Sequence, residues 1–277
     1  MKYYIIAGEA SGDLHGSNLI RGILNYDPDA EICAWGGEKM QEAGAEIRKH
    51  YKKLAIMGFV EVLMHLKTIR KNFKFAKKDI REFNPDLVIT IDFPGFNLRM
   101  AEWTYKNDFR HFHYISPNVW AWKKKRVYKM KKYLDGIFVI LPFEKSFYKE
   151  FGVDVEYEGH PLLDAVERYN PSDEKSFRKK HSLSEKPVIA LMPGSRKQEI
   201  SRMLPLMLKT AEKHPDFEYL IVAAPAIDND YYQKFIRNYS QVHLIPESAY
   251  DILSHAVAGM ITSGTATLEA ALFDVPQ

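Results

Sequence analysis

The chain has 277 residues, of which 46% are hydrophobic. A chain of this length buries a large core and makes one large domain or two ordinary ones, and we expect two. Its 39 Lys and Arg residues nearly balance its 36 Asp and Glu residues, for a formal net charge of +3. This balance argues against a protein that binds polyanions through its net charge, and we expect no nucleic-acid partner.

The chain has a single cysteine, Cys33. One cysteine excludes an intramolecular disulfide and a cysteine-based zinc site, and the apolar stretch EICAWGG favours a buried structural thiol in a reducing compartment. No apolar run reaches the ~18 residues of a membrane-spanning helix, and residues 1–7 do not resemble a signal peptide. We therefore expect a cytoplasmic protein that is free to touch a membrane surface.

Short stretches rich in Val, Ile and aromatic residues recur along the chain and are predicted as strands. In order they are YYIIAG, EICAWG, DLVITID, HFHYIS, GIFVIL, PVIALMP, EYLIVAA, VHLIP and GMITSG. Between most of them, apolar residues recur three and four positions apart, which predicts helices that alternate with the strands. The fold class is therefore α/β, built around parallel sheets.

A change of composition divides the chain into two predicted domains. The polar stretch from Glu167 to Pro187 contains two prolines and separates the two sets of strands. We predict a first domain over residues 1–166, a linker over 167–186 and a second domain over 187–277. Four strands are few for a doubly wound domain, and the last segment, GTATLEAALFDVPQ, should lead into another strand. We therefore expect the second domain to be incomplete and the chain to be part of a longer protein.

The first predicted turn between a strand and a helix, GEASGD, has unusual composition for a simple connection. Gly8 and Gly12 allow a close backbone approach, and Ser11 or Asp13 is expected to cap the next helix. Glu9 has no capping duty and lies beside small residues that leave room for a ligand. The alternative is a well-capped first helix without a ligand. Since ligands of open α/β sheets bind at such turns, we predict that this turn contributes to a site.

Asp92 ends the apolar run DLVITID, at another turn where a ligand would bind. A carboxylate at the end of a buried strand is unfavourable unless it has hydrogen-bond partners or a catalytic function. Partial desolvation raises its proton affinity towards that of a general base. The alternative is an N-cap for the helix expected near Asn97. Asp92 lies five residues too early for that role, with Pro94 and Gly95 between.

Two further turns, both in the second half, have the composition of phosphate-binding sites. PVIALMPGSRKQEI predicts a strand, a Pro-Gly-Ser turn and a helix that starts at Arg196, whose guanidinium offers two parallel donors to an anion. GMITSGTATLEAAL repeats the arrangement, and Glu269 lies one helical turn beyond Thr265, where a carboxylate suits ribose hydroxyls. Each turn alone is typical of an ordinary helix cap, whereas the two together predict a diphosphate site.

Taken together, AGEASGDLHG, MGFVEVL, IDFPGFN, HYISPNVWAW, LPFEKSFY, GHPLLD, LMPGSRKQEI and SGTATLEAAL resemble the lipid A disaccharide synthase family along essentially the whole chain. The resemblance implies a B-type glycosyltransferase with two Rossmann-like domains that face each other across a cleft. It also implies inverting transfer of 2,3-diacylglucosamine from its UDP derivative to the 6-hydroxyl of 2,3-diacylglucosamine 1-phosphate, with release of UDP. No metal or other cofactor is implied, because arginine and helix termini neutralise the diphosphate.

The resemblance also implies roles for individual residues. Asp92 matches the proposed general base and Arg196 the arginine that neutralises the departing UDP, and we count Glu9 with them as a catalytic candidate. Many relatives read DAPDFN where this chain reads DFPGFN, so Gly95 replaces a second carboxylate and Asp92 becomes the important acid of the pair. The expected UDP-binding residues are Gly194, Ser195, Arg196, Ser263, Gly264, Thr265 and Glu269. The expected contacts to the sugar substrates are Ser11, Gly12, Asp13, Asn97, Ser116, Asn118 and Trp120.

A basic amphipathic pattern runs from Met57 to Lys78, with Phe59, Leu63 and Leu66 among its apolar residues. Such a helix suits an interfacial location, and the expected partner is the inner face of the inner membrane, with peripheral attachment. A second basic cluster, WAWKKKRVYKMKK, is a candidate contact for anionic lipid or for the acceptor phosphate. The alternative for the first pattern is an apolar stripe that packs on the sheet. A homodimer is left open.

Two other functions are compatible with these motifs. One is a different UDP-sugar enzyme of the same fold, such as a peptidoglycan glycosyltransferase or a UDP-sugar epimerase, which would share the nucleotide-binding turns but not GEASGD or SPNVWAW. The other is an inactive nucleotide-binding fragment.

Overall fold

The computed structural model describes residues 1–54, 66–225, 227–245 and 249–277. The chain divides into two units, Met1–Pro161 and Leu162–Gln277. The division falls a few residues before the predicted boundary. The segment expected to be a linker contains helix α9 (Glu174–His181), which buries Phe177 in the core of the second unit.

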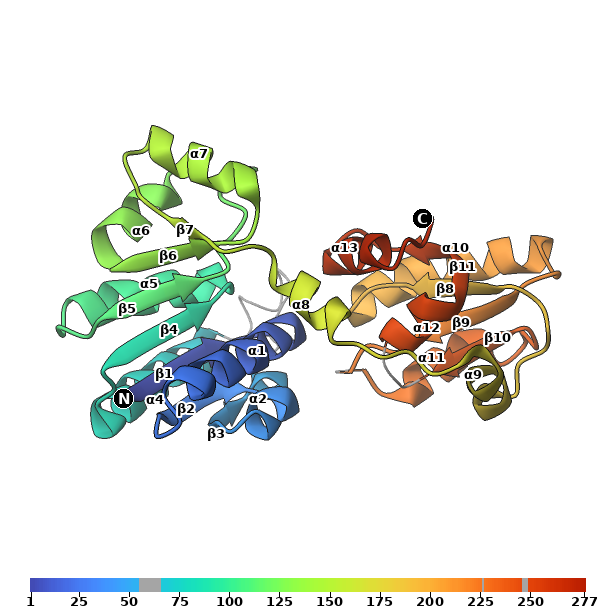
Figure 1. Ribbon diagram of the computed structural model, residues 1–277, viewed down its shortest axis with the longest axis horizontal. Coiled ribbons are helices and arrows are strands. Elements are labelled where there is room, and N and C mark those ends of the chain that lie inside the picture. The colour runs from blue at the N-terminus through green and yellow to red at the C-terminus, as the bar shows by residue number, and fades with distance from the viewer. Residues whose placement is uncertain (55–65, 226, 246–248) are drawn as a thin grey trace. The chain divides into compact units, whose positions relative to one another are not determined.

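A parallel sheet of seven strands forms the centre of the first unit within the described residues. The strands are β1 (Lys2–Ala7), β2 (Glu31–Gly36), β3 (Glu46–His50), β4 (Leu87–Ile91), β5 (His111–Tyr114), β6 (Gly136–Val139) and β7 (Glu156–Tyr157). Their spatial order is β3-β2-β1-β4-β5-β6-β7, which Figure 1 shows from bottom to top. After β1, the chain adds β2 and β3 on one side of it. It then places β4 on the other side of β1 and adds β5, β6 and β7 beyond β4.

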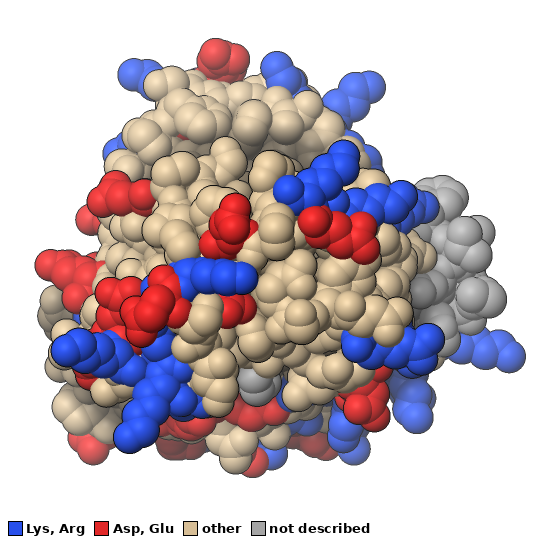
Figure 2. All heavy atoms as spheres, turned by 90° about the vertical axis from the view of Figure 1, so that its right-hand side faces the viewer, with Lys and Arg blue, Asp and Glu red and all other residues tan. Residues whose placement is uncertain are grey.

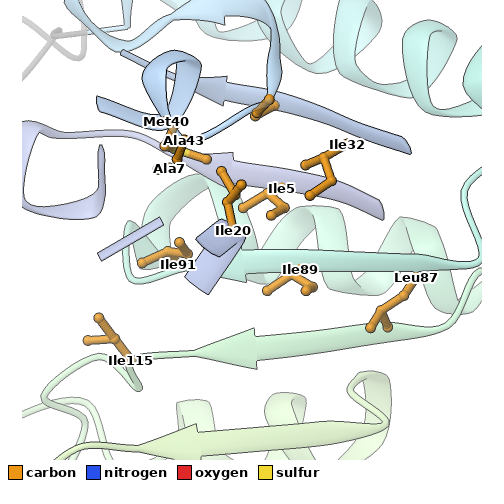
Figure 3. Packing of buried hydrophobic residues seen from close by; sticks show 12 residues of the cluster. Ile5, Ala7, Ile20, Ile32, Met40, Ala43, Leu87, Ile89, Ile91 and Ile115 are labelled. Atoms are coloured by element: carbon orange, nitrogen blue, oxygen red, sulfur yellow. The ribbon is translucent and has the colours of Figure 1, made fainter. Parts of the chain in front are cut away.

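Helices cover both faces of this sheet. They are α1 (Ala10–Tyr26), α2 (Glu38–Glu42), the 3-10 turn η1 (Tyr51–Lys53), α4 (Leu66–Phe83), α5 (Pro94–Tyr105), α6 (Arg126–Tyr133) and α7 (Pro142–Glu150). On one face, Ile20 of α1 and Met40 of α2 pack against Ile5, Ile89 and other strand residues (Figure 3). On the other face, α4 and α5 pack against Tyr4, Ile6 and Val88. Burial on both faces is why β1, β2 and β4 read as continuous apolar runs.

The second unit repeats the plan on a smaller scale. Its described strands are β8 (Val188–Met192), β9 (Glu218–Val222), β10 (Val242–Ile245) and β11 (Ala256–Ile261), paired in parallel in the order β10-β9-β8-β11. Helices α10 (Lys197–Lys213) and α11 (Asn229–Ile236) pack on one face. Helices α9, α12 (Ala249–His255) and α13 (Thr265–Leu272) pack on the other, and α8 (Pro161–Glu167) lies where the two units join in the chain.

The predicted fold class is confirmed, because all nine predicted strands form and every strand pairing in the described residues is parallel. Two strands were missed. β3 carries the charged sequence EIRKH on a sheet edge, where water replaces apolar packing, and β7 has only two residues.

The basic pattern at residues 57–78 is described only in part. Met57, Phe59 and Leu63 lie outside the described residues. In helix α4, Phe73, Ala76 and Ile80 pack against the sheet, as the alternative interpretation expected, while the lysines lie mostly on the outer side. None of the described helices combines the length and the apolar character needed to cross a membrane. On the face shown in Figure 2, basic and acidic side chains are interspersed, consistent with the nearly balanced charge.

Candidate active site

The predicted site residues that follow β1 and β4 lie at the point where the strand order of the first unit reverses. β1 pairs with β2 on one side and with β4 on the other, so the turns that follow β1 and β4 are neighbours at the carboxyl edge of the sheet. Glu9 follows β1 and Asp92 follows β4. Ligands of open α/β sheets bind in the crevice at such a reversal point. The structure thus brings together the two carboxylates that the sequence indicated.

Asp92 lies in a tight and unusual turn. Asp92 has φ 42° and Phe93 has φ 48°, so two consecutive residues with side chains adopt the left-handed region. This conformation is unfavourable for residues other than glycine, and at active sites it is sustained by the surrounding structure. Helix α5 begins directly afterwards at Pro94, a favoured first helical residue. The turn projects Asp92 from the end of the strand.

The Asp92 carboxyl is accessible yet poorly hydrated. The residue is exposed at the surface, while the protein around it crowds the carboxyl. Desolvation is the largest cause that raises the pKa of Asp92 from 3.8 to about 6, the negative charge of Glu9 raises it further, and a hydrogen bond from the Phe93 backbone opposes both. A carboxyl with this pKa is largely ionised at neutral pH and accepts a proton more readily than an ordinary aspartate, as a general base requires.

The motif GEASGD is mainly structural. A side chain on Gly8 would collide with the Phe93 ring, with a Cβ to Cγ distance of 2.5 Å, and a Cβ on Gly12 would lie 3.1 Å from that of Ala7. The Asp13 carboxylate is 3% exposed and accepts hydrogen bonds from the backbone N–H groups of Gly37 at 2.6 Å, Lys39 at 3.2 Å and Met40 at 3.1 Å.

Asp13 therefore caps the distant helix α2 and has no oxygen directed to a substrate. The expectation that Ser11 or Asp13 caps the following helix is wrong, because α1 begins at Ala10 with Glu9 in the N-cap position and no side-chain cap. Glu9, Ala10 and Ser11 are the partly exposed members of the motif, whereas Gly12 is buried.

Of the predicted substrate contacts after β5, Asn118 alone is exposed. Ser116 is buried and hydrogen-bonds to the Tyr148 hydroxyl, and Trp120 packs edge-on against Phe143 with ring centroids 5.0 Å apart. Asn97 is fully buried, and its side chain bonds to the backbone of the Asp92 turn. Ser116 and Asn97 thus support the site from within instead of facing a substrate.

A chain of four buried side chains connects α5 to β4 and β5. The Thr104 hydroxyl lies 3.1 Å from the Met100 carbonyl and 3.0 Å from the Ala101 carbonyl, to which it donates. His111 Nδ1 lies 2.7 Å from Thr104 Oγ1, His111 Nε2 lies 2.8 Å from Thr90 Oγ1, and Thr90 Oγ1 lies 2.7 Å from His113 Nδ1.

These contacts determine the tautomers of both histidines. Because the Thr104 proton is used on a carbonyl, His111 donates from Nδ1, and Thr90 donates to His111 Nε2 and accepts from His113 Nδ1. Both rings are neutral, because burial lowers the pKa of His111 to about 3 and that of His113 to about 4. The chain anchors helix α5 to the strand that carries Asp92.

The second unit has the same arrangement at its own reversal point. β8 lies between β9 and β11, and the Thr262 backbone N–H donates to the Met192 carbonyl at 2.9 Å. The turn after β8, which contains Gly194, Ser195 and Arg196, therefore adjoins the turn after β11, which contains Ser263 and Gly264. The two predicted phosphate-binding turns are brought together.

Glu199 occupies part of the first of these turns. Its Oε2 accepts from the backbone N–H groups of Ser195 at 2.9 Å and Arg196 at 3.3 Å, and its Oε1 lies 3.1 Å from Arg196 Nη1. Gly194 has φ +115°, and a side chain there would collide with Glu199. α10 begins at Lys197, with Arg196 as its N-cap and not its first residue. Two of the expected phosphate donors are therefore already hydrogen-bonded, and Arg196 remains about half exposed.

The second turn is open to solvent. Ser263, Gly264 and Thr265 are exposed, and α13 begins at Thr265 without a side-chain cap. Glu269 lies near Tyr250, whose pKa is raised by burial first and then by the charge and hydrogen bond of Glu269. The Thr267 N–H donates to the Gly264 carbonyl at 3.2 Å. The N–H groups at the very start of a helix have no intrahelical acceptor, so α13 offers those of Thr265 and Ala266 to an anion.

Sequence reasoning overlooked Glu199, Phe93 and the supporting role of Asn97. Glu199 was detectable, because a glutamate three residues after an N-cap is typical of a capping box. The positive φ values and the backbone contacts of Asn97 had no signal in the sequence.

Comparison with known proteins identifies the family. A family described as lipid-A-disaccharide synthetase matches residues 3–277. The chain belongs to this family. A lipid-A-disaccharide synthase of Syntrophus aciditrophicus is 39% identical over 98% of this chain and 72% of its own length. One of Coxiella burnetii is 36% identical over 98% of this chain and 73% of its own length.

Among solved structures, the UDP-GlcNAc 2-epimerase of Neisseria meningitidis, bound to UDP-GlcNAc, matches with a TM-score of 0.68. It is 15% identical and covers 100% of this chain and 81% of its own, so this likeness concerns the fold alone. The family assignment makes the protein a glycosyltransferase of lipid A synthesis. Its fold is that of UDP-sugar enzymes. The family match does not favour the alternative function considered from the sequence, that of a UDP-sugar epimerase.

Proposed function

We propose that the protein transfers 2,3-diacylglucosamine from its UDP derivative to the 6-hydroxyl of 2,3-diacylglucosamine 1-phosphate, with inversion, at the inner face of the inner membrane. The observation that carries the proposal is the accessible Asp92 carboxylate, with a pKa of about 6, at the reversal point of the first sheet in a member of this family.

In the proposed reaction Asp92 accepts the proton of the acceptor 6-hydroxyl as its oxygen attacks the anomeric carbon. The bond between that carbon and the UDP oxygen breaks at the same time, and UDP leaves with its electron pair. The negative charge of Glu9 raises the pKa of Asp92 and so its proton affinity. General-base assistance of this kind contributes about 10²–10⁴-fold to a rate.

The second unit is proposed to hold UDP through Arg196 and the first turn of α13. Charge builds up on the diphosphate as the glycosidic bond breaks, so a guanidinium and helix N–H groups stabilise the transition state more than the bound donor. Two findings support this placement: the exposure of residues 263–265 and their position beside the turn that carries Arg196.

Membrane contact is proposed for the outer surface of α4 and for residues 122–132. In that stretch Trp122 is 63% exposed and Tyr128 is 59% exposed. The exposed lysines of the same stretch are Lys123, Lys124, Lys125, Lys129, Lys131 and Lys132. Aromatic rings among lysines suit the headgroup region of an anionic bilayer. Helix α6 contacts α5, which lies on the same face of the sheet as α4.

The proposed substrates are tested by comparing donors. UDP release is measured with the diacylated donor and with UDP-N-acetylglucosamine, each with and without the acylated acceptor. We expect release only with the acylated donor and only when the acceptor is present. Equal turnover of both donors would overturn the substrate assignment, and release without acceptor would indicate hydrolysis instead of transfer.

A further inference from the structure

We infer that Asn97 is the positioning residue that holds Asp92 in its reactive orientation, and that the family's reaction depends on its amide group and not merely on its contribution to packing. The inference rests on the proposed role of Asp92 as general base. It differs from the sequence-based prediction, in which Asn97 was a substrate contact.

Asn97 bonds to three consecutive carbonyl oxygens around the Asp92 turn. Its Nδ2 donates to the Ile91 carbonyl at 3.1 Å and to the Asp92 carbonyl at 2.7 Å. Its backbone N–H donates to the Phe93 carbonyl at 3.0 Å. Since the two carbonyls reached by the side chain are acceptors only, the amide nitrogen and not its oxygen must face them.

The chemistry of the site explains why asparagine occupies it. A short side chain with two N–H donors is needed to reach two carbonyls from the first turn of α5, and no other side chain of this length supplies both. Asn97 is 0% exposed, and its Oδ1 has no hydrogen-bond partner among the described residues. An unpaired buried acceptor is unfavourable, so packing alone would favour leucine at this position.

The turn that Asn97 holds would not keep its shape unaided. Asp92 and Phe93 both have positive φ, and the Phe93 ring lies against Gly8 of the turn that carries Glu9. From the other side, the Asp92 backbone N–H donates to the Tyr114 carbonyl at 3.2 Å. A change of φ at Asp92 from the left-handed to the extended region would swing the carboxylate and the 92–93 peptide together, and the hydrogen bond from Asn97 Nδ2 to the Asp92 carbonyl opposes that change.

The far end of α5 is anchored independently. Thr104 joins α5 to His111, and through it to Thr90 on β4. Asn97 and Thr104 lie on the same helix, both are fully buried, and both bond to a neighbouring strand or its turn. Thr104 does not contact the Asp92 turn, which makes it the matched control for the loss of a buried hydrogen bond in α5.

The experiment compares Asn97→Leu, Thr104→Val and Asp92→Asn in the full chain by steady-state transfer kinetics and thermal unfolding. For Asn97→Leu we expect kcat to fall about 10²-fold, because misplaced reacting groups cost rates of that order. The KM for the UDP-sugar should stay within about threefold, and Thr104→Val should keep both constants within about threefold. Equal losses of kcat in Asn97→Leu and Thr104→Val at matched unfolding temperatures would overturn the inference.

The pH profile supplies a readout that a merely structural role would not change. In the wild type, the acid limb of kcat/KM is expected near the Asp92 pKa of about 6. In Asn97→Leu the limb should move towards 4, since a released turn lets water reach the carboxylate. An unmoved limb with full activity would overturn the inference.

If Asn97→Leu does not fold, Asn97→Asp takes its place. Aspartate has nearly the volume of asparagine, but its carboxylate repels the two carbonyls that the amide binds. Full activity of Asn97→Asp at pH 8 would then overturn the positioning role. Asp92→Asn separates the two assignments: an active Asp92→Asn refutes the base, whereas inactive Asp92→Asn together with active Asn97 variants refutes only the positioning role.

Discussion

Replacing Asp92 by asparagine should stabilise the protein while it removes activity, because the ionised carboxylate is held where it is poorly hydrated. The rise of the Asp92 pKa from 3.8 to about 6 corresponds to about 3 kcal/mol at ~1.4 kcal/mol per pH unit. Asp92 is an exposed residue, so solvent screens much of this effect. We therefore expect Asp92→Asn to raise the free energy of unfolding by about 1 kcal/mol at pH 8.

The sign of the pH dependence follows from the raised pKa. A carboxyl whose folded-state pKa lies above its unfolded value destabilises the fold when it ionises. The cost is absent below the unfolded pKa of 3.8, grows as the pH rises towards 6 and is complete above it. The difference in stability between Asp92→Asn and the wild type should therefore be full at pH 8 and vanish near pH 4.

Thermal unfolding at both pH values measures this difference. A gain of about 1 kcal/mol raises Tm by about 2–4 °C for a unit of this size. Asp29→Asn, which neutralises an exposed carboxylate in the turn after α1, is the control for net charge. Equal Tm values for Asp92→Asn and wild type at pH 8 would refute the reasoning, as would a gain that persists at pH 4.

Three further changes test other parts of the structure. Arg196→Ala should weaken UDP binding by ~1.5–3 kcal/mol, which is typical of a hydrogen bond to a charged group. Calorimetry measures this affinity, and an unchanged value would show that Arg196 does not bind the phosphates. Asp13→Ala should lower the free energy of unfolding in urea by about 2–4 kcal/mol, since three backbone N–H groups, two of them buried, lose their acceptor. Unaltered stability would contradict its role as a cap. Replacing Trp122 and Tyr128 together by serine should reduce binding to vesicles rich in phosphatidylglycerol without changing the circular dichroism, and undiminished binding would place the membrane contact elsewhere.

Most of the fold was predictable because buried parallel strands leave a strong pattern in sequence. DLVITID and PVIALMP are apolar on both faces, and the helices between the strands show regular spacing of apolar residues. β3 was hidden, because the edge strand EIRKH is mostly charged. The N-terminal limit of the basic helix remains a prediction, since residues 55–65 are outside the described part of the chain.

The site was predictable in its location and less so in its details. Asp92 and Arg196 could be singled out because each follows a recognisable strand, and strand ends gather at one edge of a parallel sheet. Asp13 was misinterpreted because its partners are 24–27 residues away along the chain, beyond the reach of any local pattern. Asn97 was taken for a substrate contact because sequence does not show whether an amide faces solvent or the backbone of its own turn.

The assignment of Asp92 as general base is tested most directly by measuring transfer and UDP affinity together for Asp92→Asn at pH 8. We predict that transfer falls by at least about 10²-fold, as expected when a general base is lost, while the Kd for UDP changes by no more than about threefold. Full transfer activity in this variant would contradict the proposed mechanism.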